Sequence, residues 1–375
     1  MSEKGFKELR GKEKEDQMKI KIKILNFLII FLVILISISF SKDSKELTQS
    51  FPFEQNGKWG YISKIDDTRT GPFSAESTPS SGNLAQIEPG EKGGQTEKPE
   101  YDYVGGFFEG LAVVKIGDKY GFIDETEEVV IPAQFELVGR FSEGFAGVRV
   151  GGKWGFINKT GKVIIEPEYN FVGDFTEGLA GVRMGGKWGF IDKNGKMVIY
   201  PQFDFAWLFS EGLAAVQKEY GDKYGYIDKT GKMVIEPRFD DVSPFSEGLA
   251  GVKIEKKWGY IDKTGDMVIH PQFKDTGVFT EGLAMVDISG KCGFIDKTGK
   301  IVIPLKYDSA FPFSEGLAPV LIDKKWGYIN KTGKMIIQPQ FDFAGIFSEG
   351  LAGVKLGDRW GFIDRSGKFV EKTEK

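Results

Sequence analysis

The sequence predicts an all-β protein built from tandem antiparallel repeats, and three observations support this prediction. The first is a fixed period: one unit runs from Phe141 to Asp174 and the next starts at Phe175, so the step is 175 − 141 = 34 residues. The second is that each unit contains short runs that alternate in the manner of strands, separated by turn residues. The third is the content of 50 glycines, which is typical of a chain dense in turns. A period of about 20–50 residues indicates a solenoid, a propeller or another repeat array.

Anchor phenylalanines mark eight units along the chain. They are Phe107, Phe141, Phe175, Phe209, Phe245, Phe279, Phe313 and Phe347. The step 245 − 209 = 36 is two residues longer than the others, because residues are added within Lys218–Asp222. A broken unit precedes the array, since Gly57–Ile62 matches the middle of a unit and Pro99–Gly105 matches its end.

The unit that begins at Phe175 shows which strands to expect. Leu179–Met184 alternates as a first strand, and Gly185-Gly186 then suits a two-residue hairpin turn, which requires positive φ. Lys187–Ile191 is the second strand. Asp192–Gly195 suits a type I turn that ends in glycine, and Lys196–Ile199 is the third strand. The sequence therefore predicts a three-stranded antiparallel meander in each unit.

The second and third strands are apolar on both faces, and an isolated sheet of this kind is unstable in water. The units are therefore expected to stack and share a core. A unit of about 34 residues is short for a four-stranded propeller blade. We therefore favour an open β-solenoid or superhelix, with a closed propeller-like toroid as the alternative.

The repeat array is predicted to span residues 51–371, with a flexible insertion at residues 66–98. That insertion is rich in Ser, Gly, Pro, Thr and Glu and has few apolar residues. Such a segment cannot bury enough surface to offset its ordering entropy.

Residues 1–41 form a basic segment followed by an apolar one. Lys19, Lys21 and Lys23 precede an apolar run over residues 24–40. This order is typical of a signal peptide, or of a signal anchor that stays in the inner membrane. In either case the repeats are expected to be exported to the periplasm, the cell envelope or the medium. Met18 is a candidate for the true start.

Two segments in particular identify a family resemblance. Phe245–Ile269 and Phe347–Val370 resemble the bacterial WG-repeat, or KWG-repeat, family. The resemblance implies an all-β repeat of often exported bacterial proteins, with no catalytic residues to transfer. Tyr120, Tyr224 and Cys292 depart from the pattern because they replace Trp.

The composition excludes several classes of site. The net charge of −4 is spread over all units, so the basic patch that nucleic-acid binding requires is missing. A single cysteine and a single histidine exclude an intrachain disulfide and a Cys/His zinc site. We therefore predict no catalytic, metal or cofactor-binding residues and no cofactor.

One aromatic position recurs in the second strand. It holds Trp59, Trp154, Trp188, Trp258, Trp326 and Trp360. A ladder that stacks on sugars is one interpretation, and packing between adjacent units is the other. Packing is favoured because Tyr and Cys replace Trp at this position and a ligand ladder would not accept Cys. The glycine after each aromatic is expected to lie under a ring of the neighbouring unit.

One glutamate position recurs before Gly-Leu-Ala. It holds Glu109, Glu143, Glu177, Glu211, Glu247, Glu281, Glu315 and Glu349. A row of carboxylates that binds cations is one interpretation. However, Ca²⁺ requires about six or more oxygens, and one Glu per unit supplies too few. We therefore expect each carboxylate to accept backbone N–H bonds or to pair with a lysine.

Specificity is expected at positions that vary between units. On the first strand these are Arg149, Arg183, Gln217, Lys253, Asp287, Leu321 and Lys355. Trp207 is a possible contact residue, because it stands where most units have glycine.

Together these features predict an exported, non-enzymatic scaffold that binds an unknown protein or an envelope glycan. It is not expected to bind nucleic acid, and it would meet a membrane only through its N-terminal apolar segment. One alternative is a module that binds cell-wall polysaccharide. Another is a hydrolase that uses two of the repeated carboxylates.

Overall fold

The structure is a computed structural model that describes residues 50–55, 58–63, 101–357 and 359–370. Every regular element of these residues is a β-strand. In the same residues, no helix has the length and apolar character needed to cross a membrane. The predicted N-terminal segment (1–41) and the predicted insertion (66–98) lie outside the described residues.

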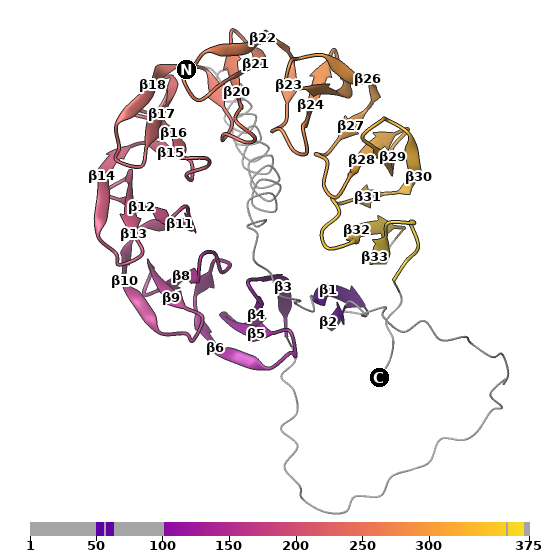
Figure 1. Cartoon of the computed structure of the whole chain (residues 1–375). Helices are drawn as coiled ribbons and strands as arrows, with labels where there is room; N and C mark the ends of the chain where they lie inside the picture. Colours follow the sequence, from indigo (N-terminus) through magenta and orange to yellow (C-terminus); the bar gives the residue numbers. More distant parts are fainter. Residues whose placement is uncertain (1–49, 56–57, 64–100, 358, 371–375) are drawn as a thin grey trace, which may run out of the picture.

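The strands form nine sheets arranged around a ring (Figure 1). Seven sheets have four strands in sequence order, and we call them blades 1 to 7. Blade 8 has three strands. The ninth sheet pairs β1 (Ser50–Gln55) with β2 (Lys58–Ser63). It lies between the first and last blades, where β1 contacts both β3 and β33.

The first strand of each blade lies on the inside of the ring (Figure 1). These strands are β3 (Tyr103–Phe108), β7 (Leu137–Val138), β11 (Phe171–Thr176), β15 (Phe205–Ala206), β19 (Asp241–Val242), β23 (Asp275–Thr276), β27 (Ser309–Ala310) and β31 (Phe343–Ala344). The second strands are β4 (Leu111–Ile116), β8 (Phe145–Val150), β12 (Leu179–Met184), β16 (Leu213–Gln217), β20 (Ala250–Ile254), β24 (Leu283–Ile288), β28 (Leu317–Ile322) and β32 (Leu351–Leu356).

The third and fourth strands complete each blade toward the outside. The third strands are β5 (Lys119–Asp124), β9 (Lys153–Asn158), β13 (Lys187–Asp192), β17 (Tyr224–Asp228), β21 (Lys257–Ile261), β25 (Lys291–Asp296), β29 (Lys325–Asn330) and β33 (Arg359–Asp364). The fourth strands are β6 (Val129–Phe135), β10 (Val163–Tyr169), β14 (Met197–Phe203), β18 (Met233–Phe239), β22 (Met267–Phe273), β26 (Ile301–Tyr307) and β30 (Met335–Phe341).

The hydrophobic core lies between neighbouring blades rather than inside any one of them. Between blades 3 and 4, Phe190 and Ile199 of one blade pack against Phe209, Ala214 and Val216 of the next. The ring centroids of Phe190 and Phe209 are 4.8 Å apart in an edge-to-face arrangement. Equivalent pairs join the other blades, so each anchor phenylalanine from Phe141 to Phe347 packs on the aromatic residue two positions after the Trp, Tyr or Cys of the preceding unit. Because each blade needs both neighbours to cover its faces, the blades stabilise one another.

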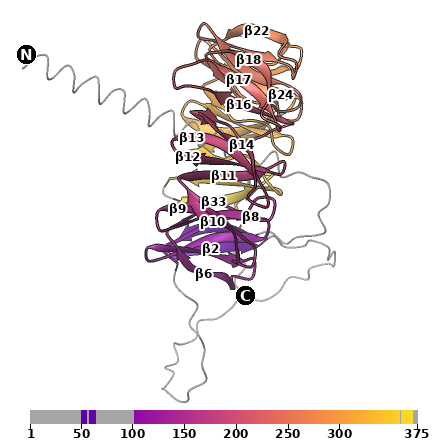
Figure 2. The same cartoon turned by 90° about the vertical axis from the view of Figure 1, so that its left-hand side faces the viewer.

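The all-β tandem repeat is confirmed, and the closed ring is the alternative that the structure adopts; the open solenoid was wrong. Each blade is a wedge, with a first strand of two residues in most blades and a fourth strand of seven. Wedges that pack face to face turn in one direction and close, as in a propeller. Figure 2 views the ring from its side, where the blades follow one another in a single layer.

The prediction of three strands per unit was wrong by one. The missing strand comes from the segment before each anchor phenylalanine, as where Phe205 and Ala206 pair with Gln217 and Val216. Two residues are too few to show an alternating pattern, so the sequence gives no signal for this strand.

Candidate binding surface

The ring has two faces, set by the two ends of every second strand. At one end lies the turn formed by Ser, Glu and Gly, and we call this side the turn face. At the other end lies the hairpin between the second and third strands, and we call this side the hairpin face. The conserved glutamates of the repeat lie on the turn face, and the positions that vary from unit to unit lie near the hairpin face.

On the turn face, the repeated glutamates join each blade to the next. The carboxylate of Glu247 accepts the backbone N–H of Gly282 at 3.0 Å and pairs with Lys297 Nζ at 3.1 Å, and both partners belong to the following blade. The backbone bond recurs for Glu109, Glu143, Glu177, Glu211, Glu281 and Glu315. The ion pair recurs for the first five of these six, and Arg365 donates to the Glu315 carbonyl. The carboxylates of these glutamates are therefore bonded to donors of the following blade.

Each of these glutamates has a left-handed backbone, which is unusual for a residue with a side chain. Glu247 has φ of 53° and the following Gly248 has φ of 88°. Two successive positive φ values are typical of a type I′ turn, which prefers Asn, Asp or Gly. A glutamate at this position indicates that the bonds of its side chain to the next blade outweigh the energetic cost of the left-handed backbone.

A second set of carboxylates joins blades on the hairpin face. Asp308 accepts Lys291 Nζ of the preceding blade at 2.6 Å and the backbone N–H of Asp323 in its own hairpin at 3.1 Å. The hydrogen bond from Lys291 is the main reason why the pKa of Asp308 is lowered. Lys187–Asp204 and Lys325–Asp342 repeat the ion pair.

The tryptophans of the repeat lie near the hairpin face, at the edge of the interfaces between blades. Trp154, Trp188 and Trp258 are half-buried, Trp326 is buried and Trp360 is 52% exposed. The side chain of Trp59 is outside the described part of the structure. The centre of each interface is filled by the aromatic residue two positions later, such as Phe156 or Tyr260. The repeated tryptophans therefore pack around the edge of the core.

The glycine after each tryptophan does not lie under a neighbouring ring, so that prediction was wrong. A Cβ at Gly189 would lie 2.4 Å from the Ile199 carbonyl oxygen and 2.7 Å from the Pro201 nitrogen. Both atoms belong to the fourth strand of the same blade, where the register shifts. Glycine is required because the bulged fourth strand crosses directly over this position.

Trp207 is half-buried rather than projecting from the ring. It packs on the core between blades 4 and 5, and its ring centroid is 5.7 Å from that of Phe205. The structure places it on the inner side of blade 4, just after the first strand.

Exposed large apolar side chains fall into two groups. One group occurs along the fourth strands and includes Val198 and Tyr200 on blade 3. The other group we call the hairpin-face patch, and its members come from blade 8 and from blades 1 to 4, on either side of the sheet formed by β1 and β2. They are Tyr103, Ile116, Leu137, Val150, Phe171, Met184, Tyr220, Phe343, Leu356 and Trp360. A clustered apolar surface of this kind indicates a binding site.

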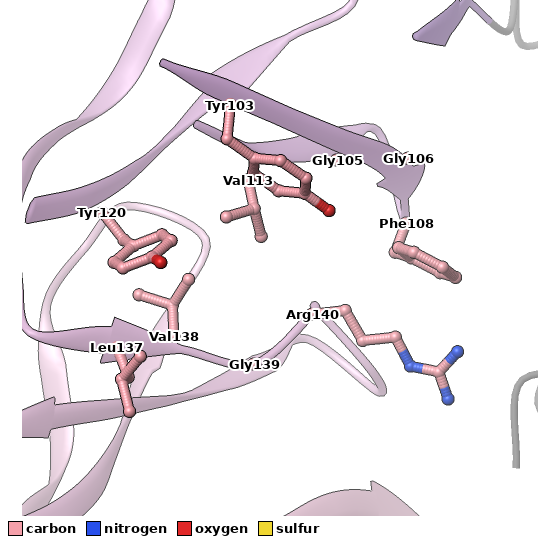
Figure 3. A pocket seen from close by; sticks show the side chains of 10 residues that line it. All are labelled: Tyr103, Gly105, Gly106, Phe108, Val113, Tyr120, Leu137, Val138, Gly139 and Arg140. Atoms are coloured by element: carbon pink, nitrogen blue, oxygen red, sulfur yellow. The ribbon is translucent and has the colours of Figure 1, made fainter. Parts of the chain in front are cut away.

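A cavity of about 430 Å³ adjoins the patch, between blades 1 and 2. Tyr120, Leu137 and Val138 line one end, and Phe108 and Arg140 line the other (Figure 3). The volume is in the range of cavities that hold a small ligand or a side chain. Sequence reasoning missed this cavity.

The cavity exists because blade 2 does not cover the first strand of blade 1. Between blades 3 and 4, by contrast, the residue that precedes the anchor phenylalanine of blade 4 covers a glycine in the first strand of blade 3. A Cβ at that glycine, Gly173, would lie 2.8 Å from Leu208 Cδ2. Arg140 occupies the matching position in blade 2, but its Nε pairs with Asp174 Oδ2 at 2.9 Å and its guanidinium lies over the Phe108 ring. The nearest atoms to a Cβ at Gly105 therefore belong to its own blade.

On the opposite side of the ring, acidic residues occupy the first-strand position that Phe171 holds in blade 3. The first strands of blades 5 and 6 begin with Asp241 and Asp275, and Asp275 pairs in register with Asp287. Burial raises the pKa of Asp275 and raises that of Cys292 to about 11. Among the described residues, no three His, Cys, Asp or Glu side chains are grouped to hold a metal.

In comparison with solved structures, a eukaryotic initiation factor shows the same type of fold. It superposes with a TM-score of 0.55 at 11% identity, over 87% of this chain and 96% of that one. Virginiamycin B lyase from Staphylococcus aureus has a TM-score of 0.34 at 12% identity, over 62% of this chain and 92% of that one. A surface component of the type-IX secretion system of Porphyromonas gingivalis has a TM-score of 0.33 at 9% identity, over 70% and 45%.

No curated protein matches the chain in sequence. The family model described as WG containing repeat matches eight consecutive segments, at residues 98–120, 120–154, 154–188, 188–221, 224–258, 258–292, 293–326 and 326–360. Apart from the first, each segment runs from the third strand of one blade to the third strand of the next or just before it, and together the segments cover most of the chain. The chain therefore belongs to the family of WG-containing repeat proteins.

Proposed function

We propose that this protein is an exported, non-enzymatic scaffold that binds a partner protein through the hairpin face of its ring. One observation supports this most directly. The charged residues that recur along the array bond to the neighbouring blade, whereas the exposed large apolar residues of the hairpin face come from blade 8 and from blades 1 to 4. The repeated residues therefore maintain the ring, and the residues that vary are available to a partner.

The composition of the hairpin-face patch favours a protein partner over a polysaccharide. Aromatic residues, Met and Arg are enriched at protein interfaces. The patch holds Phe171, Met184 and Trp360, and Arg183 pairs in register with Phe171. A sugar ladder instead requires flat ring faces in sequence. Here Phe171 is inclined at 54° to Trp154 and at 74° to Trp188.

Export is proposed from the sequence of the N-terminal segment. Lys19, Lys21 and Lys23 followed by the apolar run 24–40 favour retention of the basic flank in the cytosol. A reporter enzyme fused after Lys375 is expected to be active only outside the inner membrane. Reporter activity in the cytosol would contradict export while leaving the binding surface untouched.

Site-specific photo-crosslinking in the native host tests the binding surface. A photoreactive residue at Phe171 is expected to give a discrete crosslinked protein. The same residue at Tyr200, exposed on the fourth strand of the same blade, serves as the matched control. Equal crosslinking from both positions, or none from Phe171, would contradict a protein-binding hairpin face.

A further inference from the structure

Blades 2 and 3 hold a cluster of aromatic side chains within the hairpin-face patch. The exposed ring of Phe171 lies between Trp154 of blade 2 and Trp188 of its own blade, with centroid distances of 5.8 and 5.7 Å. Phe171 is 50% exposed, while both indoles are half-buried beside it. Three aromatic side chains therefore form one raised apolar ridge across the interface between the two blades.

Positive charge borders this ridge. Arg149 and Arg183 pair in register with Trp154 and Trp188, and Arg183 pairs in register with Phe171 on its other side. Arg183 is exposed, and its Nε donates to the Gly186 carbonyl in its own hairpin. Arg149 Nε is buried and, in the part of the chain that the structure describes, donates no hydrogen bond.

The carboxylates nearby offset only part of this charge. Glu136 lies 3.7 Å from Arg149 Nε and also accepts two backbone N–H groups of the hairpin. Blade 3 has the neutral Asn170 at the matching position. Asp204 pairs with Lys187.

Four cations therefore face two carboxylates around the ridge, and 4 − 2 leaves a net charge of +2. The cations are Arg149, Lys153, Arg183 and Lys187, and the carboxylates are Glu136 and Asp204. A third carboxylate, Glu168, lies on the outer strand of blade 2 beside Tyr169, which pairs in register with Trp154. Counting Glu168 as well, 4 − 3 leaves a net charge of +1.

The hairpin tips leave this surface open. Both hairpins have Gly-Gly turns, at Gly151-Gly152 and Gly185-Gly186, and a Cβ at Gly151, Gly185 or Gly186 would meet nothing within 4 Å. The hairpin of blade 5 instead has Glu255-Lys256 in the turn, both with positive φ. Small turns allow the backbone of a partner to approach the ridge closely.

From these features we infer that the partner binds through an acidic segment that carries a large apolar side chain, and that this side chain enters the cavity between blades 1 and 2. This inference rests on the proposed function and specifies the chemistry of the partner. The net charge of the ridge attracts carboxylates, and the ridge itself covers apolar side chains of the segment. Leu137 and Tyr103 belong both to the patch and to the cavity lining, so the two surfaces are continuous.

The cavity suits an uncharged anchor. The guanidinium at its end is already paired with Asp174, whose pKa is raised by burial even though Arg140 opposes the shift. The remaining lining named above is aromatic or aliphatic. Filling such a cavity with a large apolar side chain is typical of the residues that dominate binding energy at protein interfaces.

The test uses the full-length protein and a displayed library of random 16-residue peptides. Selected peptides are expected to have net negative charge and at least one Phe, Trp, Leu or Met. One selected peptide is then synthesised with a fluorescent label, together with a version in which Asp and Glu are replaced by Lys. The acidic peptide is expected to bind and the basic version to bind at least tenfold more weakly.

Four variants locate the bound peptide. Phe171→Ser and Arg183→Glu are each expected to weaken binding at least tenfold, with cooperative melting of each variant showing that the ring is still folded. Gly106→Val places a side chain into the cavity without a clash, since the nearest atom to its Cβ is Phe108 Cε2 at 3.7 Å. Gly106→Val is expected to remove the contribution of the peptide's apolar anchor to binding. Changing that anchor residue of the peptide to Ala should then leave the affinity for Gly106→Val unchanged. Tyr200→Ser, the control, is expected to bind within twofold of the wild type.

Two kinds of result overturn the inference. One is selection of neutral or basic peptides, or equal binding of the acidic peptide by Phe171→Ser. The other is binding of vesicles of phosphatidylcholine and phosphatidylglycerol, or of purified cell-wall polysaccharide, that depends on Phe171 when no acidic peptide binds. Crosslinking from Phe171 to a protein without an acidic apolar segment would retain the proposed function and refute only this inference.

Discussion

Replacing Glu247 by Gly tests whether the repeated glutamates stabilise the ring by joining blades. The substitution removes the hydrogen bond to the Gly282 N–H and the ion pair with Lys297. A hydrogen bond to a charged group contributes about 1.5–3 kcal/mol. An ion pair between partly exposed side chains contributes about 0.2–1 kcal/mol.

The same substitution also relieves the backbone. Glu247 has φ of 53°, and a left-handed conformation costs a residue with a side chain about 1–2 kcal/mol. Glycine regains part of this, although it loses more chain entropy on folding. The expected balance is a loss of about 1–3 kcal/mol in the free energy of unfolding, from these terms. For a chain of this size, the melting temperature should fall by roughly 2–6 °C.

Glu255→Gly is the matched control, because Glu255 has φ of 48° in the hairpin of blade 5. Among the described residues its exposed carboxylate makes no bond to another blade, so only the backbone term remains. Its melting temperature should rise by up to about 2 °C. Glu247→Gln, which retains the length of the side chain, should lie between wild type and Glu247→Gly. If Glu247→Gly melts at or above wild type, as Glu255→Gly should, the interblade account is refuted.

Three further predictions concern other parts of the ring. Trp326→Ala should lower the free energy of unfolding by about 3–5 kcal/mol because the indole is buried, whereas Trp360→Ala should cost much less; equal losses in denaturant titrations would contradict the burial. The pKa of Asp308 is lowered chiefly by its hydrogen bond from Lys291. The ionised carboxylate therefore stabilises the folded ring at pH values above the ordinary carboxyl pKa of about 4, and this stabilisation is lost as the pH falls through the lower pKa of Asp308 in the folded protein. Asp308→Asn should therefore show a smaller drop in melting temperature between pH 6 and 3 than wild type, and identical drops would refute this. Replacing residues 66–98 with a short Gly-containing turn should change the melting temperature little, because loop closure entropy depends weakly on length; loss of cooperative melting would show that the segment is part of the fold.

Much of the fold could be predicted from the sequence, since period, turns and strand alternation recur eight times. Leu179–Met184 and Lys187–Asp192 appear where the pattern indicated, in the expected antiparallel register. The closure of the ring could not be predicted in the same way. It depends on strands such as Phe205–Ala206, which are short because the chain turns inward toward the axis, and a two-residue strand has no periodicity.

The candidate site was predicted only in part. The sequence varies between units along the predicted first strand, which is the second strand of each blade in the structure. This variation identified Arg149 and Arg183, which the structure places beside the aromatic ridge. The same comparison of units shows that Phe171 is aromatic where blades 5 and 6 have Asp241 and Asp275. That contrast acquires meaning only when the closed ring places these blades on opposite sides. The cavity depends on the direction taken by the Arg140 side chain, which no sequence pattern specifies.

The two kinds of position in this repeat follow opposite physical requirements. A residue that bonds to the next blade must be the same in every unit, because every interface has the same geometry; the glutamates and their lysine partners satisfy this condition. A residue that recognises one partner must break the repetition, because a ring of eight equal sites would bind in eight orientations. The first strands satisfy this second condition, with aromatic side chains such as Phe171 on one side of the ring and carboxylates such as Asp275 on the other. Under the proposed function, this loss of symmetry at the inner edge would let the ring hold one partner in one orientation.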